Sequence, residues 1–194
     1  MEEIDSHARD RADMERLMSG QDTALNDLME RHAAPVFHFL CRMVGNEDDA
    51  NDLAQETFAR VFRARANFRL NEKFSTWLYT IAANLARNHF RWRARHPNFS
   101  LHTAAEDPEQ SLENILPAQD ATPSEQTLAT ERAAAVRAAV GGLPEELREA
   151  MVLCEWEERS VAEAAAILES TPKAVESRLY RARKILRERL EQWL

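Results

Sequence analysis

The residues with the clearest chemistry lie near the C-terminus, where cationic and polar side chains recur along one predicted helix. They are Lys173, Glu176, Ser177, Arg178 and Arg181. Side chains of these types contact phosphates or hydrogen-bond to the edges of bases in the major groove. The pattern therefore indicates a helix that reads duplex DNA. From spacing alone, the alternative is a solvated basic helix that ends an all-α bundle.

The segment from Ser160 to Leu190 contains the two helices needed to position these side chains. Ser160 and Glu163 have the capping-box spacing, which predicts the start of a short helix. Ser170-Thr171-Pro172 then supplies a hydroxyl cap and a proline at the first position of a second helix. Along this second helix the apolar residues recur every three or four positions and predict one buried stripe: Val175, Leu179, Ala182, Leu186 and Leu190. Two helices arranged in this way match a helix-turn-helix.

A second group of arginine side chains ends an earlier predicted helix, from about Phe74 to Arg95. Aromatic rings lie between these arginines, and such a mixture suits single-stranded nucleic acid, because rings stack on unpaired bases and guanidinium groups neutralise phosphates. Trp77 and Phe90 are at least as well explained as core residues. Packing explains less well the polar residues that recur beside Trp77 at helical spacing, which are Asn84, Asn88 and Arg91.

A third helix, predicted from Asn46 to Arg65, has an acidic first turn, where the helix dipole favours negative charge. One face carries the polar residues Asp49, Asp52, Gln55, Glu56 and Arg60. From the pattern alone, a solvated acidic face is the preferred interpretation.

The remaining signals predict further helices in the same two groups. Asp10 to Met18 is a short helical pattern closed by Gly20, and Asp22 is expected to cap the next helix. Pro35 predicts a break or kink near Ala34 and a second segment, Val36 to Val44, ended by Gly45. In the second half of the chain, Thr122-Pro123-Ser124-Glu125 predicts a helix ended by Gly141-Gly142, and Pro144 predicts the start of the next helix.

Residues 97–121 differ in composition from the segments on both sides. They contain three prolines and five acidic residues, with neither lysine nor arginine: Pro97, Pro108, Pro117, Glu106, Asp107, Glu109, Glu113 and Asp120. We expect an acidic flexible linker between two helical domains, 1–96 and 122–194. It is either a plain tether or a segment whose negative charge lets it enter a basic channel of a partner.

Composition limits the classes of fold and function. Only four glycines and few β-branched runs in 194 residues predict an all-α protein. The net charge of −8 argues against a protein that coats nucleic acid on its own. We find no convincing nucleophile and base, and no phosphate-binding glycine loop, so we expect neither an enzyme nor a cofactor.

Other sequence features concern metal binding and location. His38 and Cys41 lie one turn apart, but no second pair completes a tetrahedral site, so no metal is expected. We expect Cys41 and Cys154 to be buried thiols in a reducing compartment. The acidic N-terminus is unlike a signal peptide, and no apolar run is long enough to span a bilayer. These features predict a cytoplasmic protein.

Three runs of residues also resemble a known family. AVESRLYRARKIL (Ala174 to Leu186) is similar to the recognition helix of the extracytoplasmic-function (ECF) group of bacterial sigma-70 factors. DANDLAQETF (Asp49 to Phe58) resembles the segment that docks on the clamp helices of core RNA polymerase. FSTWLYTIAANLARN (Phe74 to Asn88) resembles the segment that melts and reads the minus-10 promoter element. The resemblance covers about Asp22 to Arg95 and Thr122 to Leu190.

The resemblance implies a factor that binds core RNA polymerase and promoter DNA, and that has an anti-sigma factor as a further partner. The implied polymerase-binding residues are Asp49, Asp52, Gln55 and Glu56. The residues implied to contact the melted minus-10 strand are Lys73, Trp77, Asn84, Asn88 and Arg91. The loop from Phe68 to Lys73 is implied to hold a flipped base. For the minus-35 duplex they are Lys173, Glu176, Ser177, Arg178 and Arg181.

Two positions depart from the family pattern, and one rival interpretation remains open. Glu169 stands in the turn where the family has glycine, so we expect a turn conformation that tolerates a side chain. Glu176 stands where a basic residue is common, and it either accepts from a cytosine amino group or reduces attraction to phosphate.

The rival interpretation is a stand-alone helix-turn-helix regulator that binds an operator without polymerase. Its N-terminal half would then serve as a sensor or dimerisation module.

Overall fold

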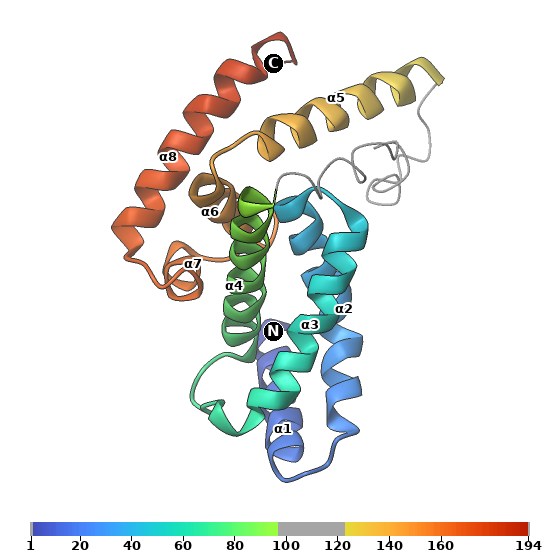
Figure 1. Cartoon of the computed structure of the whole chain (residues 1–194), viewed down its shortest axis with the longest axis vertical. Coiled ribbons are helices and arrows are strands. Elements are labelled where there is room, and N and C mark those ends of the chain that lie inside the picture. The colour runs from blue at the N-terminus through green and yellow to red at the C-terminus, as the bar shows by residue number, and fades with distance from the viewer. Residues whose placement is uncertain (1, 97–122, 194) are drawn as a thin grey trace.

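The computed structural model describes residues 2–96 and 123–193, and every regular element in these ranges is a helix. The N-terminal domain contains α1 (Glu2–Met18), α2 (Ala24–Val44), α3 (Glu47–Ala64), the 3-10 turn η1 (Arg65–Asn67) and α4 (Phe74–Arg95). The C-terminal domain contains α5 (Pro123–Gly141), α6 (Glu145–Glu155), α7 (Val161–Ile167), α8 (Pro172–Arg189) and the 3-10 turn η4 (Glu191–Trp193) (Figure 1). The predicted all-α fold with two domains is confirmed. The predicted linker lies outside the described residues.

The N-terminal domain is built on the packing of α2, α3 and α4. Leu28 and Phe39 of α2, Phe58 of α3, and Leu78 and Tyr79 of α4 are all buried in one core. Buried residues recur every three or four positions along these helices, as Ala50, Ala54 and Phe58 do in α3, so each helix buries one stripe and exposes a polar face. The bounds of α3 and α4 agree with the sequence predictions to within one residue. Together the three helices form the frame that positions the polar residues of α3 and α4.

Near Ala34 the sequence predicts a break or a kink, and the break is wrong, because α2 is one continuous helix of 21 residues that contains Pro35. Proline cannot donate the backbone hydrogen bond to the carbonyl four residues earlier, which normally weakens a helix interior. Val36, Phe39 and Leu40 follow directly and are fully buried. Tertiary packing of this segment outweighs the local cost of the missing bond. The predicted end at Gly45 is confirmed, since this residue takes a left-handed φ of 74°.

Helix α1 begins at Glu2 rather than at the predicted Asp10. Acidic residue types, which the sequence has at positions 2, 3 and 5, are favoured in the first turn of a helix because they complement its dipole. The sequence predicts Asp22 as the cap of α2, but the N-cap residue is Thr23, and no side-chain hydrogen bond caps α2 there.

A buried ionic network joins α1 to α2. Arg31 donates from Nε to Asp10 Oδ1 at 3.0 Å and from Nη2 to Asp13 Oδ2 at 2.5 Å. His32 Nε2 lies 2.9 Å from both carboxylate oxygens of Asp10. Asp10 and Asp13 are both buried, and buried carboxylates are tolerated when they are paired in this way. The network fixes α1 against the side of α2.

The C-terminal domain ends in the predicted helix-turn-helix. Ser160 caps α7 through a complete capping box with Glu163, and the Thr171 hydroxyl accepts from the backbone N–H of Ala174 at the start of α8. Pro172 is the first residue of α8, as predicted. Because both starts are set by local side-chain to backbone bonds, they could be identified from sequence.

From the sequence we expect the turn between α7 and α8 to adopt a conformation that tolerates a side chain. It adopts instead the left-handed conformation that glycine favours. Glu169 takes a left-handed φ of 50°. The backbone N–H of Ser170 donates to Ala165 O, and that of Glu169 donates to Ala166 O, which together form a Schellman motif. The turn therefore keeps the geometry that glycine favours, with a glutamate in it.

The two domains pack against each other, and their buried side chains form one continuous cluster. The C-terminal domain packs on the N-terminal domain through α7 against α4 and through α5 and α6 against α2. Cys41 and Cys154 are free and half-buried rather than fully buried. Within the described ranges, none of the helices has the length and apolar character that crossing a bilayer would require.

Candidate nucleic-acid and protein interfaces

Helix α8 presents a polar face beside a buried stripe. Val175, Leu179, Ala182 and Leu186 are buried, as the spacing predicted. Four of the five residues predicted to contact duplex DNA are exposed, namely Lys173, Glu176, Ser177 and Arg181. An exposed polar face on the second helix of a helix-turn-helix is the geometry needed for insertion into a major groove.

Arg178 is the exception in this set, because its side chain is only 19% exposed. Its Nε lies 3.7 Å from a carboxylate oxygen of Glu146 on α6. This residue therefore lies at the edge of the exposed face, where it can bridge α8 to α6. The large apolar ring of Tyr180, 73% exposed, stands beside the polar face.

The polar residues of α4 are organised as two pairs along one side of the helix. Arg87 Nη1 donates to Asn84 Oδ1 at 2.9 Å, and Arg91 Nη2 donates to Asn88 Oδ1 at 2.7 Å. Each arginine holds the amide oxygen of its asparagine, so the amide nitrogen remains available as a donor. Asn84, Asn88 and Arg91, predicted to read the minus-10 strand, thus share one side with Arg87, which the prediction omitted.

The other two residues of the predicted minus-10 set lie at the N-terminal end of α4. Trp77 packs against Phe68 and Phe74, with ring centroids 5.1 and 6.2 Å apart, so much of its ring belongs to the core. Lys73 is the N-cap residue of α4, and its ammonium group contacts Glu163 of the other domain at 2.8 Å. The structure places Lys73 at the domain boundary.

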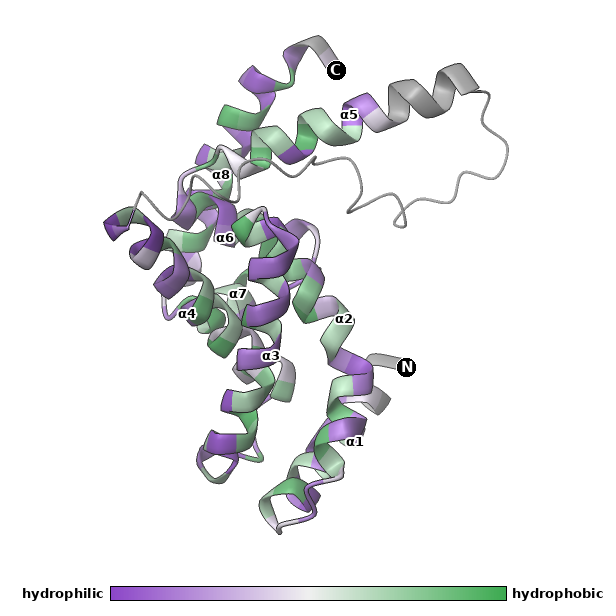
Figure 2. Cartoon of the chain, turned by 45° about the vertical axis from the view of Figure 1, so that its right-hand side comes forward, coloured by the Kyte–Doolittle hydropathy of each residue, from purple (hydrophilic) through white to green (hydrophobic). Residues whose placement is uncertain are grey.

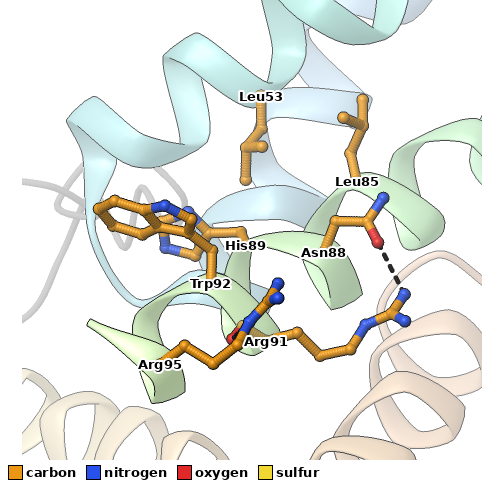
Figure 3. Close-up of a pocket in the computed structure, with 7 residues that line it drawn as sticks. All are labelled: Leu53, Leu85, Asn88, His89, Arg91, Trp92 and Arg95. Atoms are coloured by element: carbon orange, nitrogen blue, oxygen red, sulfur yellow. Dashed lines mark hydrogen bonds between the residues drawn. The ribbon is translucent and has the colours of Figure 1, made fainter. Parts of the chain in front are cut away.

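A pocket of about 420 Å³ lies where the C-terminal end of α4 meets α3. Leu53 and Leu85 form an apolar side, and Figure 3 shows Arg91, Trp92 and Arg95 around the rest. Trp92 is 44% exposed and stacks on His96 at 4.9 Å. Arginine beside an exposed aromatic ring is the combination that single-stranded nucleic acid requires.

Helix α3 presents acidic and amide side chains on its outer face. Figure 2 shows hydrophilic residues, in purple, along the visible side of α3. Asp52 and Gln55 are exposed. Glu56 accepts from Arg60 at 2.9 Å and from Arg63 at 2.8 Å, and these bonds hold the pKa of its carboxyl below the usual value. A basic partner would therefore have to compete with Arg60 and Arg63 for Glu56.

Asp49, the fourth residue of the predicted polymerase-binding set, turns toward α4 instead. Its Oδ2 lies 3.4 Å from His89 Nε2 and 3.5 Å from Arg93 Nη1. Burial lowers the pKa of His89. Asp49 is thus partly engaged in holding α3 to α4, whereas Asp52 and Gln55 form the accessible part of this face.

Sequence reasoning missed the residues that join the two domains. They include Arg42, Tyr79, Arg87, Glu149 and Glu157. Glu149 is 2% exposed, although glutamate normally indicates a surface position. The sequence contains one indication that Glu149 is buried. Glu149 stands four residues before the buried Leu153 and so falls on the apolar stripe of α6.

Comparisons with known proteins identify the family of this chain. The family model for sigma-70 region 2 matches residues 28–96, and that for sigma-70 region 4 matches residues 133–186. The RNA polymerase sigma-H factor of Pseudomonas aeruginosa is 34% identical over 186 residues, covering 93% of each chain. The chain belongs to the ECF group of the sigma-70 family. The ECF sigma-E factor of Haemophilus influenzae is 32% identical and covers 94% of this ECF sigma factor and 95% of its own length.

Two solved structures share the fold of this ECF sigma factor over most of its length. CnrH in complex with the cytosolic domain of CnrY matches with a TM-score of 0.68 and 26% identity, covering 95% of this chain and 98% of CnrH. The sigma factor RpoE of Bartonella quintana, in complex with the anti-sigma factor NepR, matches with a TM-score of 0.66 and 25% identity, covering 87% and 98%.

Proposed function

We propose that this ECF sigma factor binds core RNA polymerase and directs it to promoters, with the C-terminal domain (122–194) reading the minus-35 duplex and the N-terminal domain (1–96) reading and melting the minus-10 element. It acts in the cytoplasm as a non-catalytic initiation factor. The observation that carries the proposal is the presence of three separate polar faces, on α3, α4 and α8, in one chain of this family.

In this proposal each face has one role. Asp52, Gln55 and Glu56 of α3 meet basic residues of the polymerase, a contact that speeds association and weakens with salt. The exposed residues of α8 contact the minus-35 duplex as phosphate or base contacts. Asn84, Asn88 and Arg91 of α4 contact the minus-10 strand after melting, and Trp92 at the rim of the pocket offers a ring on which an unpaired base can stack.

Two further parts of the proposal concern regulation and the linker. Both solved neighbours are complexes with a second protein, and the second protein bound to RpoE is the anti-sigma factor NepR. On this similarity, the present chain also binds an anti-sigma factor. Residues 97–121 connect the two domains, and their negative charge suits passage through a basic channel of the polymerase. Replacing their five acids with amides is then expected to reduce open-complex formation.

The test of the main proposal is run-off transcription with purified core polymerase on a pool of promoter fragments, with and without this protein. Duplex binding by the protein alone is measured in parallel. Specific transcripts that need both components are the expected result. Tight duplex binding by the free protein without any transcript would favour the stand-alone regulator, which also presents an exposed α8.

A further inference from the structure

Two cationic side chains of the N-terminal domain form ion pairs with carboxylates of the C-terminal domain. Lys73 Nζ lies 2.8 Å from Glu163 Oε1, and Arg87 Nε lies 2.6 Å from Glu149 Oε1. Both cations belong to the edge of α4 that carries the proposed minus-10 contacts. The carboxylate of Glu163 comes from α7, which packs against α4, and that of Glu149 comes from α6, which packs against α2 and reaches α4 through this ion pair.

A third carboxylate, that of Glu157, contacts the second turn of α4 at the same boundary. It accepts from Tyr79 Oη at 2.5 Å and from Arg42 Nη1 at 3.3 Å. The side chains of Glu149 and Glu157 are only 3% and 8% exposed, and burial raises the pKa of both carboxyls. Buried carboxylates are costly unless their partners are well placed, so these two faces are matched to each other.

Charges also cross the boundary in the opposite direction. Arg148 donates from Nη1 to Met43 O at 2.5 Å, and its guanidinium lies 5.4 Å from the Phe90 ring centroid. The Arg159 guanidinium lies 4.7 Å from the ring centroid of Tyr79. In this direction the cations meet a backbone carbonyl and two aromatic rings, and a shifted contact would leave these cations and the buried carboxylates without their partners.

The contact between the two domains leaves two of the three polar faces exposed and covers part of the third. The outer face of α3 and the polar face of α8 are exposed, as Asp52 and Lys173 illustrate. The side of α4 that holds Asn84 is covered at Arg87, which is hydrogen-bonded to Asn84 and to Glu149 at once. The packed chain therefore leaves its proposed polymerase and minus-35 contacts accessible and covers part of its proposed minus-10 contact.

We propose that the packed arrangement is a self-masked state of the free protein, in which carboxylates of α6 and α7 occupy the positions that nucleic-acid phosphates take on α4. Arg87 becomes available to the minus-10 strand only when the C-terminal domain moves away. The inference rests on the proposed role of α4 in strand binding. It adds that the free chain binds single strands weakly because its own C-terminal domain competes for the same cations.

The test compares the wild type with the double variant Glu149→Gln, Glu163→Gln. Glutamine keeps the size of both side chains and preserves the capping box with Ser160, so α7 keeps its start. The control double variant is Glu131→Gln, Glu158→Gln, which makes the same change in net charge at two exposed positions of the C-terminal domain. The probe is a fluorescent pool of short single-stranded DNA of randomised sequence, and binding is followed by anisotropy at fixed salt.

The interface variant is expected to bind the single-stranded pool about tenfold more tightly than the control variant. A closed state that outnumbers the open state by about ten to one lowers apparent affinity by that factor, and opening the contact removes the loss. Equal affinities of the interface and control variants would overturn the proposal. Glu163→Gln alone provides a milder variant, with an expected increase of about threefold.

Small-angle X-ray scattering of the free proteins supplies a readout that does not depend on DNA. Opening predicts a larger radius of gyration for the interface variant than for the control, and an unchanged radius would overturn the proposal. Run-off transcription by the wild type keeps the two questions separate. Promoter-specific transcripts together with equal single-strand affinities would remove the masking inference and leave the proposed function in place.

Discussion

Replacing Glu169 with glycine is expected to stabilise the C-terminal domain by about 1 kcal/mol. Glu169 has a φ of 50° in the turn between α7 and α8, where its Cβ crowds the backbone. A left-handed L-residue costs roughly 1–2 kcal/mol, and the greater freedom of glycine in the unfolded chain offsets roughly 0.4–1 kcal/mol of the gain. The Schellman hydrogen bonds of Glu169 and Ser170 are made by backbone atoms, so glycine keeps them.

Urea unfolding of the full chain, followed by circular dichroism, measures the change in the free energy of unfolding. In a separate thermal melt, a change of about 1 kcal/mol moves the midpoint by roughly 2–4 °C. The matched control is Glu169→Ala, which removes the same charge and keeps the Cβ. Glycine should stabilise and alanine should not. If both variants change the free energy of unfolding equally, the effect comes from the lost charge, and the reasoning from backbone conformation is refuted.

Three further predictions concern pH, DNA and the polymerase. Hydrogen bonds from Lys73 and Ser160 lower the pKa of Glu163 from 4.5 to about 2. Its carboxylate therefore stabilises the fold above about pH 4.5 and loses this contribution toward pH 2, so the difference in unfolding free energy between wild type and Glu163→Gln should shrink only in that range. Arg181→Ala should cost roughly 1–3 kcal/mol at selected promoters if Arg181 contacts a base, and act evenly on all promoters if it contacts a phosphate, as run-off assays on a promoter pool would show. Asp52→Lys should weaken binding to core polymerase on the order of tenfold at low salt and less at high salt, and a salt-independent loss in a binding titration would contradict the charge argument.

The helix boundaries that could be predicted from sequence are those set by neighbouring residues. The capping box at Ser160 and the Thr171-Pro172 start act within one turn, so their signals are local. Pro35 shows the limit of this reasoning, because its effect depends on the packing of the residues that follow it. Glu169 shows a second limit, since a sequence does not reveal that a turn will accept a strained residue.

Each of the three polar faces could be predicted from the sequence, but the contact between the two domains could not. Each polar face follows from helical spacing, as Asn84 and Asn88 of α4 illustrate. The domain contact depends instead on which carboxylate meets which cation across long stretches of chain, and nothing in the local pattern distinguishes the buried Glu157 from an exposed glutamate. The roles assigned to individual residues of the three faces stay predictions until the variants are measured.

The ionic network between α1 and α2 bears on where this protein can be shortened. The match to sigma-70 region 2 begins at residue 28, so α1 lies outside the segment that the family comparison detects. A chain started at that point would lose Asp10 and Asp13, leave Arg31 and His32 without these anionic neighbours, and uncover apolar surface that α1 now shields. The part of the protein that must be expressed to fold is therefore larger than its recognisable motif, and a truncation for biochemical work should retain α1.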